Sequence, residues 1–238
     1  MKATALEYRF RFLIHAMVYA LGFFAPWNMV FHFDTIRTWQ LLAATVARQG
    51  WMSFSAATIA VLVSGIVLAF AAAAIRTWGA AYLGAGVVHD GGLRGEQMVA
   101  AGPYRYLRNP LYVGTMLHTL ALGLLMPPTG AVFCVVVLAV VQWRLMDAEE
   151  AFLTAKLGES YVAYRKAVPS VVPALRPKVV TSTVRARWST AFVGEVYFWG
   201  AALSFAVAGW RYNAQLVLQG VIISLGVSLV ARAFLPKA

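Results

Sequence analysis

The chain has 238 residues, of which 61% are hydrophobic and only 12% charged, and its formal net charge is +11. A soluble domain carries about 25% charged residues, so this composition argues against a soluble globular protein and favours an integral membrane protein. The basic residues lie between long apolar runs, which indicates orientation in a membrane and not binding to nucleic acid. Cys134 is the single cysteine, so no intrachain disulfide can form.

Six apolar runs predict membrane-spanning helices. They cover residues 12–31, 54–75, 111–126, 129–146, 191–209 and 213–231. Pro127-Pro128 separates the third run from the fourth and predicts a tight helical hairpin. The apolar piece at 41–46 is too short to span and predicts an interfacial helix or loop. We therefore expect an all-α membrane protein with about six transmembrane helices.

The distribution of lysine and arginine predicts the orientation of these helices. With the N-terminus inside, only Arg37, Arg48 and Arg211 of the 20 basic residues fall outside. Both termini are then cytoplasmic, and we expect the membrane to be the bacterial inner membrane. The polar segments 76–110 and 144–190 share the cytoplasmic face and flank the hairpin, so they should meet in a cytoplasmic cofactor-binding region.

The first polar segment ends in a stretch dense in Gly, Pro, Tyr and Arg, at residues 96–114. Gly102-Pro103 predicts a turn, because glycine tolerates positive φ and proline fixes φ and removes a donor. Pro110 suits the first turn of the helix that follows. We interpret this stretch as a cofactor-binding segment on the membrane surface.

The second polar segment contains two adjacent acids, Glu149 and Glu150, close to the end of a predicted span. Unpaired carboxylates are costly near lipid, which leaves two interpretations. The acids could pair with Arg105, Arg108 or Arg144 and staple the two segments together. They could instead bind a ligand that carries a cation and hydroxyl or amine donors.

The continuation of the second segment predicts a helix and then an extended path. The helix follows from apolar and aromatic residues at helical spacing, namely Phe152, Leu153, Leu157, Tyr161 and Tyr164. Beyond it, Pro169, Pro173 and Pro177 impose an extended backbone.

Two motifs in these segments carry a resemblance to a known family. The first is Gly102-Pro103-Tyr104-Arg105-Tyr106-x-Arg108-Asn109-Pro110-x-Tyr112-x-Gly114, and the second is Glu149-Glu150-x-x-Leu153-x-x-x-x-Gly158-x-x-Tyr161-x-x-Tyr164-x-x-x-Val168-Pro169. Together, over about residues 76–175, they resemble the isoprenylcysteine carboxyl methyltransferase and phospholipid methyltransferase families of integral membrane enzymes.

The resemblance implies S-adenosylmethionine as the methyl donor, bound between the two motifs. The cofactor-binding residues that it implies are His89, Glu96, Gln97, Met98, Val99, Tyr104, Asn109, Pro110, Leu111, Tyr112, Glu149 and Glu150. It also implies a part in the reaction for Arg108, Asn109 and Tyr112. Asn109 departs from the family, which often has histidine there, and asparagine cannot act as an acid or base near neutral pH.

These observations predict S-adenosylmethionine-dependent methyl transfer to a lipophilic acceptor. The acceptor could be an isoprenylcysteine-like carboxylate, a thiol or a lipid amine. The alternative is a non-catalytic membrane transport or scaffold protein whose Arg/Glu cluster is structural. We expect a lipophilic small molecule or lipid and the membrane lipid as partners, with no nucleic acid and no metal.

The same patterns divide the chain into three regions. They also single out two polar residues outside the motifs, His118 and Glu195. Residues 1–75 form N-terminal spans, residues 76–175 the methyltransferase core and residues 176–238 a C-terminal helix pair. His118 is expected to be hydrogen-bonded within the bundle. Glu195, near the inner end of the fifth run, is expected to lie shallow enough to reach water and is a candidate for contact with substrate.

Overall fold

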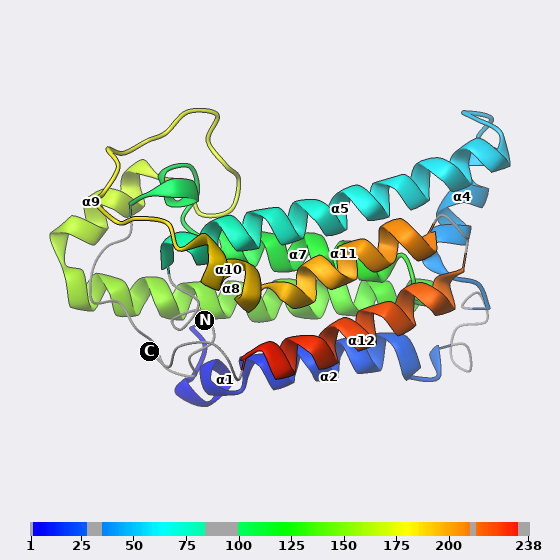
Figure 1. Cartoon of the computed structure of the whole chain (residues 1–238), viewed down its shortest axis with the longest axis horizontal. Helices are drawn as coiled ribbons and strands as arrows, with labels where there is room; N and C mark the ends of the chain where they lie inside the picture. Colours follow the sequence, from blue (N-terminus) through cyan, green and yellow to red (C-terminus); the bar gives the residue numbers. More distant parts are fainter. Residues whose placement is uncertain (1, 28–34, 84–99, 210–212, 233–238) are drawn as a thin grey trace.

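The computed structural model describes residues 2–27, 35–83, 100–209 and 213–232. Within these ranges the chain forms helices and no β-strand, which confirms the all-α class. The helices are α1 (Ala5–Arg9), α2 (Arg11–Phe24), α4 (Thr38–Arg48), α5 (Phe54–Leu83), the 3₁₀ turn η1 (Gly102–Arg105), α7 (Pro110–Gly123), α8 (Pro128–Leu157), α9 (Glu159–Ala167), α10 (Trp188–Gly194), α11 (Val196–Gly209) and α12 (Ala214–Arg232). The long helices lie side by side, and η1 and α9 form a head at one end of the bundle (Figure 1).

The helix lengths support a membrane protein. Within the described residues, α5, α8 and α12 are long and apolar enough to cross a bilayer. The pair α10 and α11, which meets at a bend of 65°, would make a fourth span, and α2 is a shorter apolar helix. At ~1.5 Å per residue, the 14 residues of α7 fall short of a bilayer's hydrocarbon thickness. Length and composition therefore support up to four spans, where six were expected.

Two helices extend beyond the apolar runs that predicted them. α5 was expected to end at residue 75 and continues to Leu83, and α8 was expected to end at residue 146 and continues to Leu157. Polar residues in these extensions have partners within the protein; Arg76 of α5, for example, pairs with Glu195. Gly158, at φ +61°, ends α8 and separates it from α9. The predicted helix over 147–164 is thus two helices with a break.

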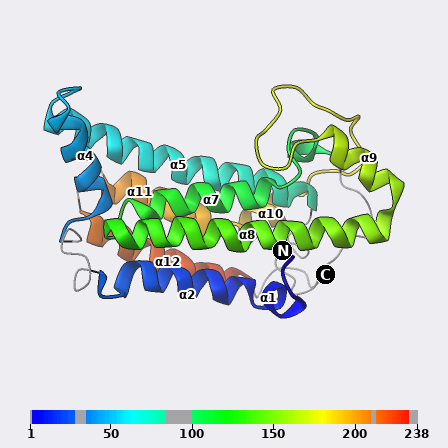
Figure 2. The same ribbon diagram turned by 180° about the vertical axis from the view of Figure 1, so that it is seen from behind.

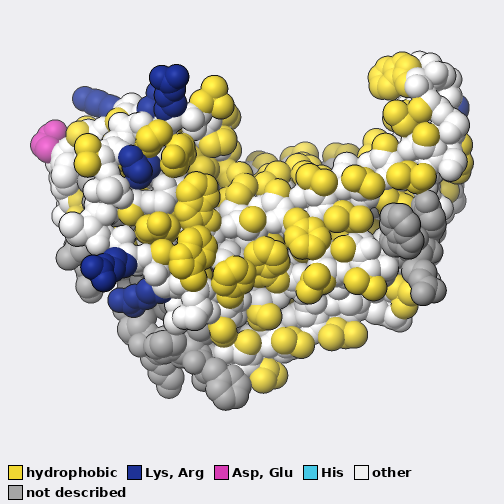
Figure 3. All heavy atoms as spheres, turned by 45° about the horizontal axis from the view of Figure 1, so that its top comes forward, with side chains coloured by type: hydrophobic (Ala, Val, Ile, Leu, Met, Phe, Trp, Pro, Cys, Tyr) yellow, Lys and Arg dark blue, Asp and Glu magenta, His cyan; other side chains and the backbone are white. Residues whose placement is uncertain are grey.

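Small residues bring the helices together, and large apolar residues face outward. Ala69, Ala121, Ala131 and Ala201 are buried in one cluster that joins α2, α5, α7, α8, α11 and α12. The outer surface between the head and the α4 end is largely hydrophobic (Figure 3). Because lipid is as apolar as leucine, close packing of small residues holds membrane helices together. The pattern supports burial of this bundle in a bilayer.

Glycines mark the closest helix contacts. α2 and α8 lie side by side in both ribbon views (Figures 1 and 2) and touch at Gly22 and Gly130. In α11 and α12, Gly200 and Gly220 each face a serine of the other helix, Ser224 and Ser204. Each serine hydroxyl donates at 2.7 Å to the carbonyl of the glycine four residues earlier in its own helix. The two Gly-x-x-x-Ser segments therefore pack against each other as a reciprocal pair.

A buried ion pair connects α5 with the junction of α10 and α11. Arg76 donates to both oxygens of Glu195, Nε at 2.6 Å and Nη2 at 3.0 Å. The side chains are 8% and 0% exposed, and the guanidinium also lies 4.1 Å from the centroid of the Phe198 ring. Glu195 was expected to reach water, and this expectation is wrong. Its charge is instead satisfied inside the protein by an arginine of a distant helix.

His118 on α7 is hydrogen-bonded within the bundle through one ring nitrogen, as predicted, and its Nδ1 has no partner among the described residues. Its Nε2 lies 2.9 Å from the hydroxyl of Tyr197 on α11. Its ring makes an edge contact with Phe198, at a centroid distance of 4.8 Å. The helix pair that ends the chain is thus joined to the hairpin by polar and aromatic contacts.

Gly130→Val should destabilise the protein, because a Cβ at this position would collide with the Gly22 carbonyl oxygen of the facing helix. Overpacking of this kind costs about 1–3 kcal/mol. The matched control is Gly226→Ala on α12, where no atom lies within 4 Å of the added carbon. Scanning calorimetry in detergent should show a lower unfolding temperature for the first variant only. Equal temperatures would contradict the close contact of α2 and α8.

Arg76→Met and Glu195→Met should each destabilise the protein strongly, because each leaves a buried charge without its partner. Breaking a buried pair in this way costs about 3–5 kcal/mol. The double variant should recover most of the loss, because two apolar side chains then fill the site. A double-mutant cycle of thermal unfolding measures the coupling. A double variant as unstable as the sum of the two single variants would show that the pair is not the source of the effect.

Candidate functional site

The two motifs meet in the head, under an extended segment that we call the strap, residues 168–187. The three prolines of the strap were expected to impose an extended path, and no helix occurs between α9 and α10. Hydrogen bonds from backbone amides tie the strap to the first motif. Ala174, Lys178 and Ser182 donate to the carbonyls of Tyr106, Arg105 and Ala100, at 2.9–3.0 Å, and Arg108 and Asn109 donate to those of Pro169 and Ser170, at 2.9 and 3.2 Å.

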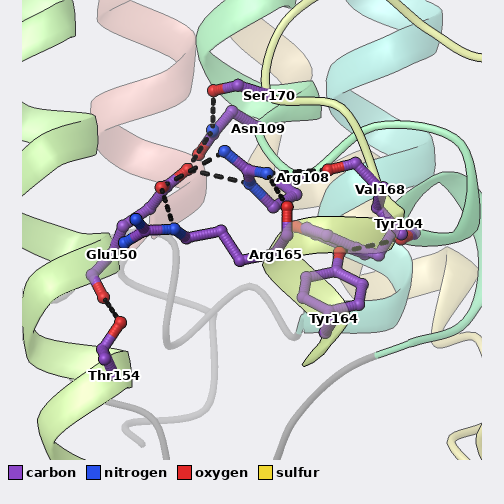
Figure 4. A network of polar contacts seen from close by, with 9 residues as sticks. All are labelled: Tyr104, Arg108, Asn109, Glu150, Thr154, Tyr164, Arg165, Val168 and Ser170. Atoms are coloured by element: carbon purple, nitrogen blue, oxygen red, sulfur yellow. Dashed lines mark hydrogen bonds and ion pairs between the residues drawn. The ribbon is translucent and has the colours of Figure 1, made fainter. Parts of the chain in front are cut away.

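An ion pair between Arg108 and Glu150 forms the centre of the contact (Figure 4). Arg108 Nε and Nη2 donate to the two carboxylate oxygens at 3.0 and 3.2 Å. Its Nη1 donates to the carbonyls of Val168 and Arg165, at the start of the strap and in α9. Four of the five guanidinium donors are therefore in use. Arg108 joins α8, α9 and the strap to the first motif.

Asn109 completes this clamp and begins the hairpin. Its Nδ2 donates to Glu150 at 3.2 Å and to the Ser170 hydroxyl at 3.0 Å (Figure 4). The next residue, Pro110, is the first of α7, as predicted. The interpretation in which the acids staple the two segments therefore holds for Glu150 and Arg108.

Tyr104 lies in η1 and is buried, with one polar atom left over. The Tyr164 hydroxyl donates at 2.8 Å to the Tyr104 carbonyl, which fixes the backbone of η1 against α9. The Tyr104 hydroxyl itself has no hydrogen-bond partner among the described residues. Burial raises the pKa of Tyr104, and the nearby Tyr164 and Glu149 raise it further. Tyr104 is thus a neutral donor and acceptor with unused capacity.

The turn before Tyr104 depends on glycine. Gly102 has φ +54°, which glycine tolerates, in agreement with the predicted turn. A Cβ at this position would also collide with the ring of Tyr82 on α5. The first motif is therefore held close against the end of α5.

Glu149 faces away from the clamp, toward the N-terminal helices. The Tyr8 hydroxyl of α1 donates to its Oε1 at 2.6 Å. Tyr112 of α7 also donates to this carboxylate, and the charge of Arg11 in α2 acts on it. Glu149 thus interacts with residues of α1, α2 and α7, while Glu150 binds Arg108, which holds the strap.

Arg76, the arginine of the buried ion pair, also contacts the first turns of α7. Arg76 Nη1 donates to the Leu111 carbonyl at 3.1 Å and to the Thr115 hydroxyl at 2.7 Å. A Cβ on Gly114 would collide with the aliphatic part of Arg76, so glycine in the motif permits this approach. The first turn of α7 is therefore fixed from α5, and through Glu195 from the C-terminal helices.

The structure brings together most of the predicted site residues that it describes. Tyr104 lies in η1, Arg108 and Asn109 lie between η1 and α7, and Glu149 and Glu150 lie in the part of α8 that meets them. Pro110, Leu111 and Tyr112 form the first turn of α7. The predicted residues His89, Glu96, Gln97, Met98 and Val99 lie outside the described residues.

Sequence reasoning missed Tyr8, Arg76 and Ser170. Arg76 had a usable signal, because a cation that continues an apolar run implies a buried partner. Tyr8 and Ser170 carried no signal of their own. Tyr8 is 141 residues from Glu149 and Ser170 is 61 residues from Asn109, so only the fold brings each pair together.

Comparisons with known proteins agree with the resemblance that the motifs carry. Residues 51–160 match the model of the phospholipid methyltransferase family. The protein-S-isoprenylcysteine O-methyltransferase of Schizosaccharomyces pombe is 35% identical over 80 residues, which cover 32% of this chain and 33% of that enzyme. The match thus spans about a third of the relative's length, and no solved structure matches the chain. The strap and α10–α12 lie beyond the family match, which ends in α9. Over residues 51–160, a little under half of its length, this integral membrane protein is similar to the phospholipid methyltransferase family.

Proposed function

We propose that the protein transfers a methyl group from S-adenosylmethionine to a lipophilic acceptor at the cytoplasmic face of the membrane. The observation that carries the proposal is the meeting of both motifs at Glu149 and Glu150, together with the buried hydroxyl of Tyr104, which has no partner among the described residues and whose pKa the charge of Glu149 raises. A carboxylate, a spare hydroxyl and a glycine turn are suited to a ligand with ribose hydroxyls and an ammonium group.

In this proposal Glu149 and Tyr104 hold the methyl donor directly. An ionised carboxylate has about four lone-pair sites, so Glu149 can accept from a ribose or amino group besides Tyr8 and Tyr112. The Tyr104 hydroxyl gains the partner that it lacks in the described protein. Asn109, Pro110, Leu111 and Tyr112 supply the turn around the donor. Residues 97–99 line its adenosine side with Glu96 beside them, and His89 supplies a further polar contact.

Arg108, Asn109 and Glu150 are committed to one another, and we assign them a positioning role. Their hydrogen bonds hold the strap and the start of α7 in register. Tyr112 remains the proposed residue nearest the reacting groups, because it bonds to Glu149 from the first turn of α7.

The chemistry fits a site without a strong base. When bound, S-adenosylmethionine supplies a methyl group on a sulfonium, which a nucleophile attacks in line. The chain then has to hold the two reactants in line and exclude water, which favours attack by an anionic acceptor. Asn109 cannot remove a proton. An acceptor that is already ionised, such as a carboxylate, therefore fits most simply, and a thiol or lipid amine remains open.

We propose that the acceptor enters from the bilayer and the donor from the cytoplasm. The head is polar and basic, while the bundle below it is apolar on its surface (Figure 3). A lipophilic acceptor partitions into the bilayer and can approach between helices. Both termini are cytoplasmic in this proposal, and α1 and the carboxyl end of α12 lie at the same end of the bundle as the head (Figure 2).

Glu149→Ala should weaken binding of S-adenosylhomocysteine, the demethylated donor, by about 10- to 100-fold. This range follows from losing a charged hydrogen bond of about 1.5–3 kcal/mol. Isothermal titration calorimetry of the purified protein measures the change. Glu159→Ala, which removes an exposed acid of α9, is the matched control and should bind normally. A wild-type protein that does not bind would contradict the assignment of the donor.

Tyr104→Phe should separate binding from stability. Removing a buried hydroxyl that has no partner among the described residues should leave thermal stability unchanged or raised. The same variant should bind S-adenosylhomocysteine several-fold more weakly, because the ligand loses a hydrogen bond of about 1 kcal/mol. A variant that binds as tightly as the wild type would show that this hydroxyl does not face the donor.

Radiolabelled S-adenosylmethionine and a membrane extract test the reaction itself. Label should enter the lipid-soluble fraction with the wild-type protein and with Glu159→Ala. It should enter far less with Glu149→Ala. The chemical nature of the labelled product then distinguishes a carboxylate from a thiol or an amine. Binding of the donor without any transfer would favour a non-catalytic protein.

A further inference from the structure

The strap presents large apolar side chains to its surroundings. Leu175 is 101% exposed, Val180 88% and Val172 76%. Several exposed aliphatic side chains within one short segment are suited to contact with an apolar partner. These residues are not needed to hold the strap, because backbone hydrogen bonds do so.

Basic residues alternate with these apolar residues. The strap contains Arg176, Lys178, Arg185 and Arg187 and has no acidic residue. All four are exposed. None of them forms an ion pair with another residue that the structure describes. Their charge is therefore available to an anionic partner.

The fold holds the strap beside the end of the candidate membrane helices at which the head lies. The Arg187 amide donates at 2.8 Å to the carbonyl of Ala81, in the last turn of α5, a candidate span. The yellow loop of the strap leaves the bundle sideways beside the end of α5 (Figure 1). Hydrophobic side chains line the edge of the head that faces the apolar bundle, and Lys and Arg stand on its outer side (Figure 3). In a bilayer crossed by α5, this end of the helix would lie near the membrane–water interface.

We propose that the strap is a membrane-docking element that binds anionic phospholipid. Leu175, Val172 and Val180 would enter the boundary between head groups and acyl chains, and the basic side chains would bind lipid phosphate. Aliphatic side chains beside the cations favour a lipid surface over nucleic acid, whose phosphates offer them no apolar partner. The hydrogen bonds to the first motif make the strap a preformed surface, which lowers the cost of binding.

This inference concerns the strap's position and is independent of methyl transfer. It would connect the lipid surface to the site, because Arg105 and Tyr106 hold the strap by their carbonyls and flank Tyr104 and Arg108. If the protein did not transfer methyl groups, the strap could still dock on the membrane. If the strap did not dock, the protein could still transfer methyl groups.

Fluorescence quenching tests where the strap lies. The full chain carrying Leu175→Cys is labelled with bimane and reconstituted into vesicles that contain lipids brominated close to the head group. Cys134 is buried, so the unaltered chain serves as the labelling control. Ser160→Cys, on the exposed face of α9, is the positional control. Strong quenching at position 175 and little at position 160 is expected. Equal and weak quenching at both would overturn the proposal.

Lipid charge tests the partner. Quenching at position 175 should be severalfold stronger in vesicles of phosphatidylcholine with phosphatidylglycerol than in phosphatidylcholine alone, and added salt should reduce the difference. Arg176→Gln with Lys178→Gln should abolish it. Lys156→Gln with Lys166→Gln changes the net charge equally outside the strap and should preserve it. Quenching that ignores lipid charge and these variants would overturn the assignment to anionic lipid.

Discussion

Glu150 has to be neutralised where α8 leaves the apolar part of the bundle, and much of the head follows from this requirement. Its carboxylate takes two donors from Arg108 and one from Asn109. Arg108 in turn binds carbonyls of α9 and of the strap's first residue. One carboxylate therefore fixes the place where the hairpin starts, where α9 ends and where the strap begins. The neighbouring acid is left to face the N-terminal helices and the proposed donor.

Local signals in the sequence predicted where turns occur and where some helices begin and end. Gly102 has the positive φ that its turn requires, Pro110 begins α7, and Pro127-Pro128 separates the two arms of the hairpin. The meeting of the two motifs also followed from placing both on one side of the membrane. These features depend on backbone conformation and on hydropathy, which are properties of neighbouring residues.

Other features depended on partners far away in the chain and could not be predicted. α5 continues past residue 75 because Arg76 is paired with Glu195, so hydropathy alone placed its end too early. The same pair explains why Glu195 is buried when its position suggested contact with water. Tyr8 joins the site because polar contacts tie α1 to α8, where Arg144 also binds Glu7. Pattern reasoning identified the motif residues and missed those that support them.

The buried pair also imposes an order on biogenesis. Arg76 precedes Glu195 by 119 residues, so at about 5–20 residues per second roughly 6–24 s of translation separate them. Arg76 meets the Leu111 carbonyl and Thr115 hydroxyl much sooner, after 35 and 39 residues. In the nascent chain, the hairpin can thus supply hydrogen-bond acceptors to this guanidinium before Glu195 has been synthesised. A charge delivered early to the insertion machinery is neutralised only when one of the last helices arrives.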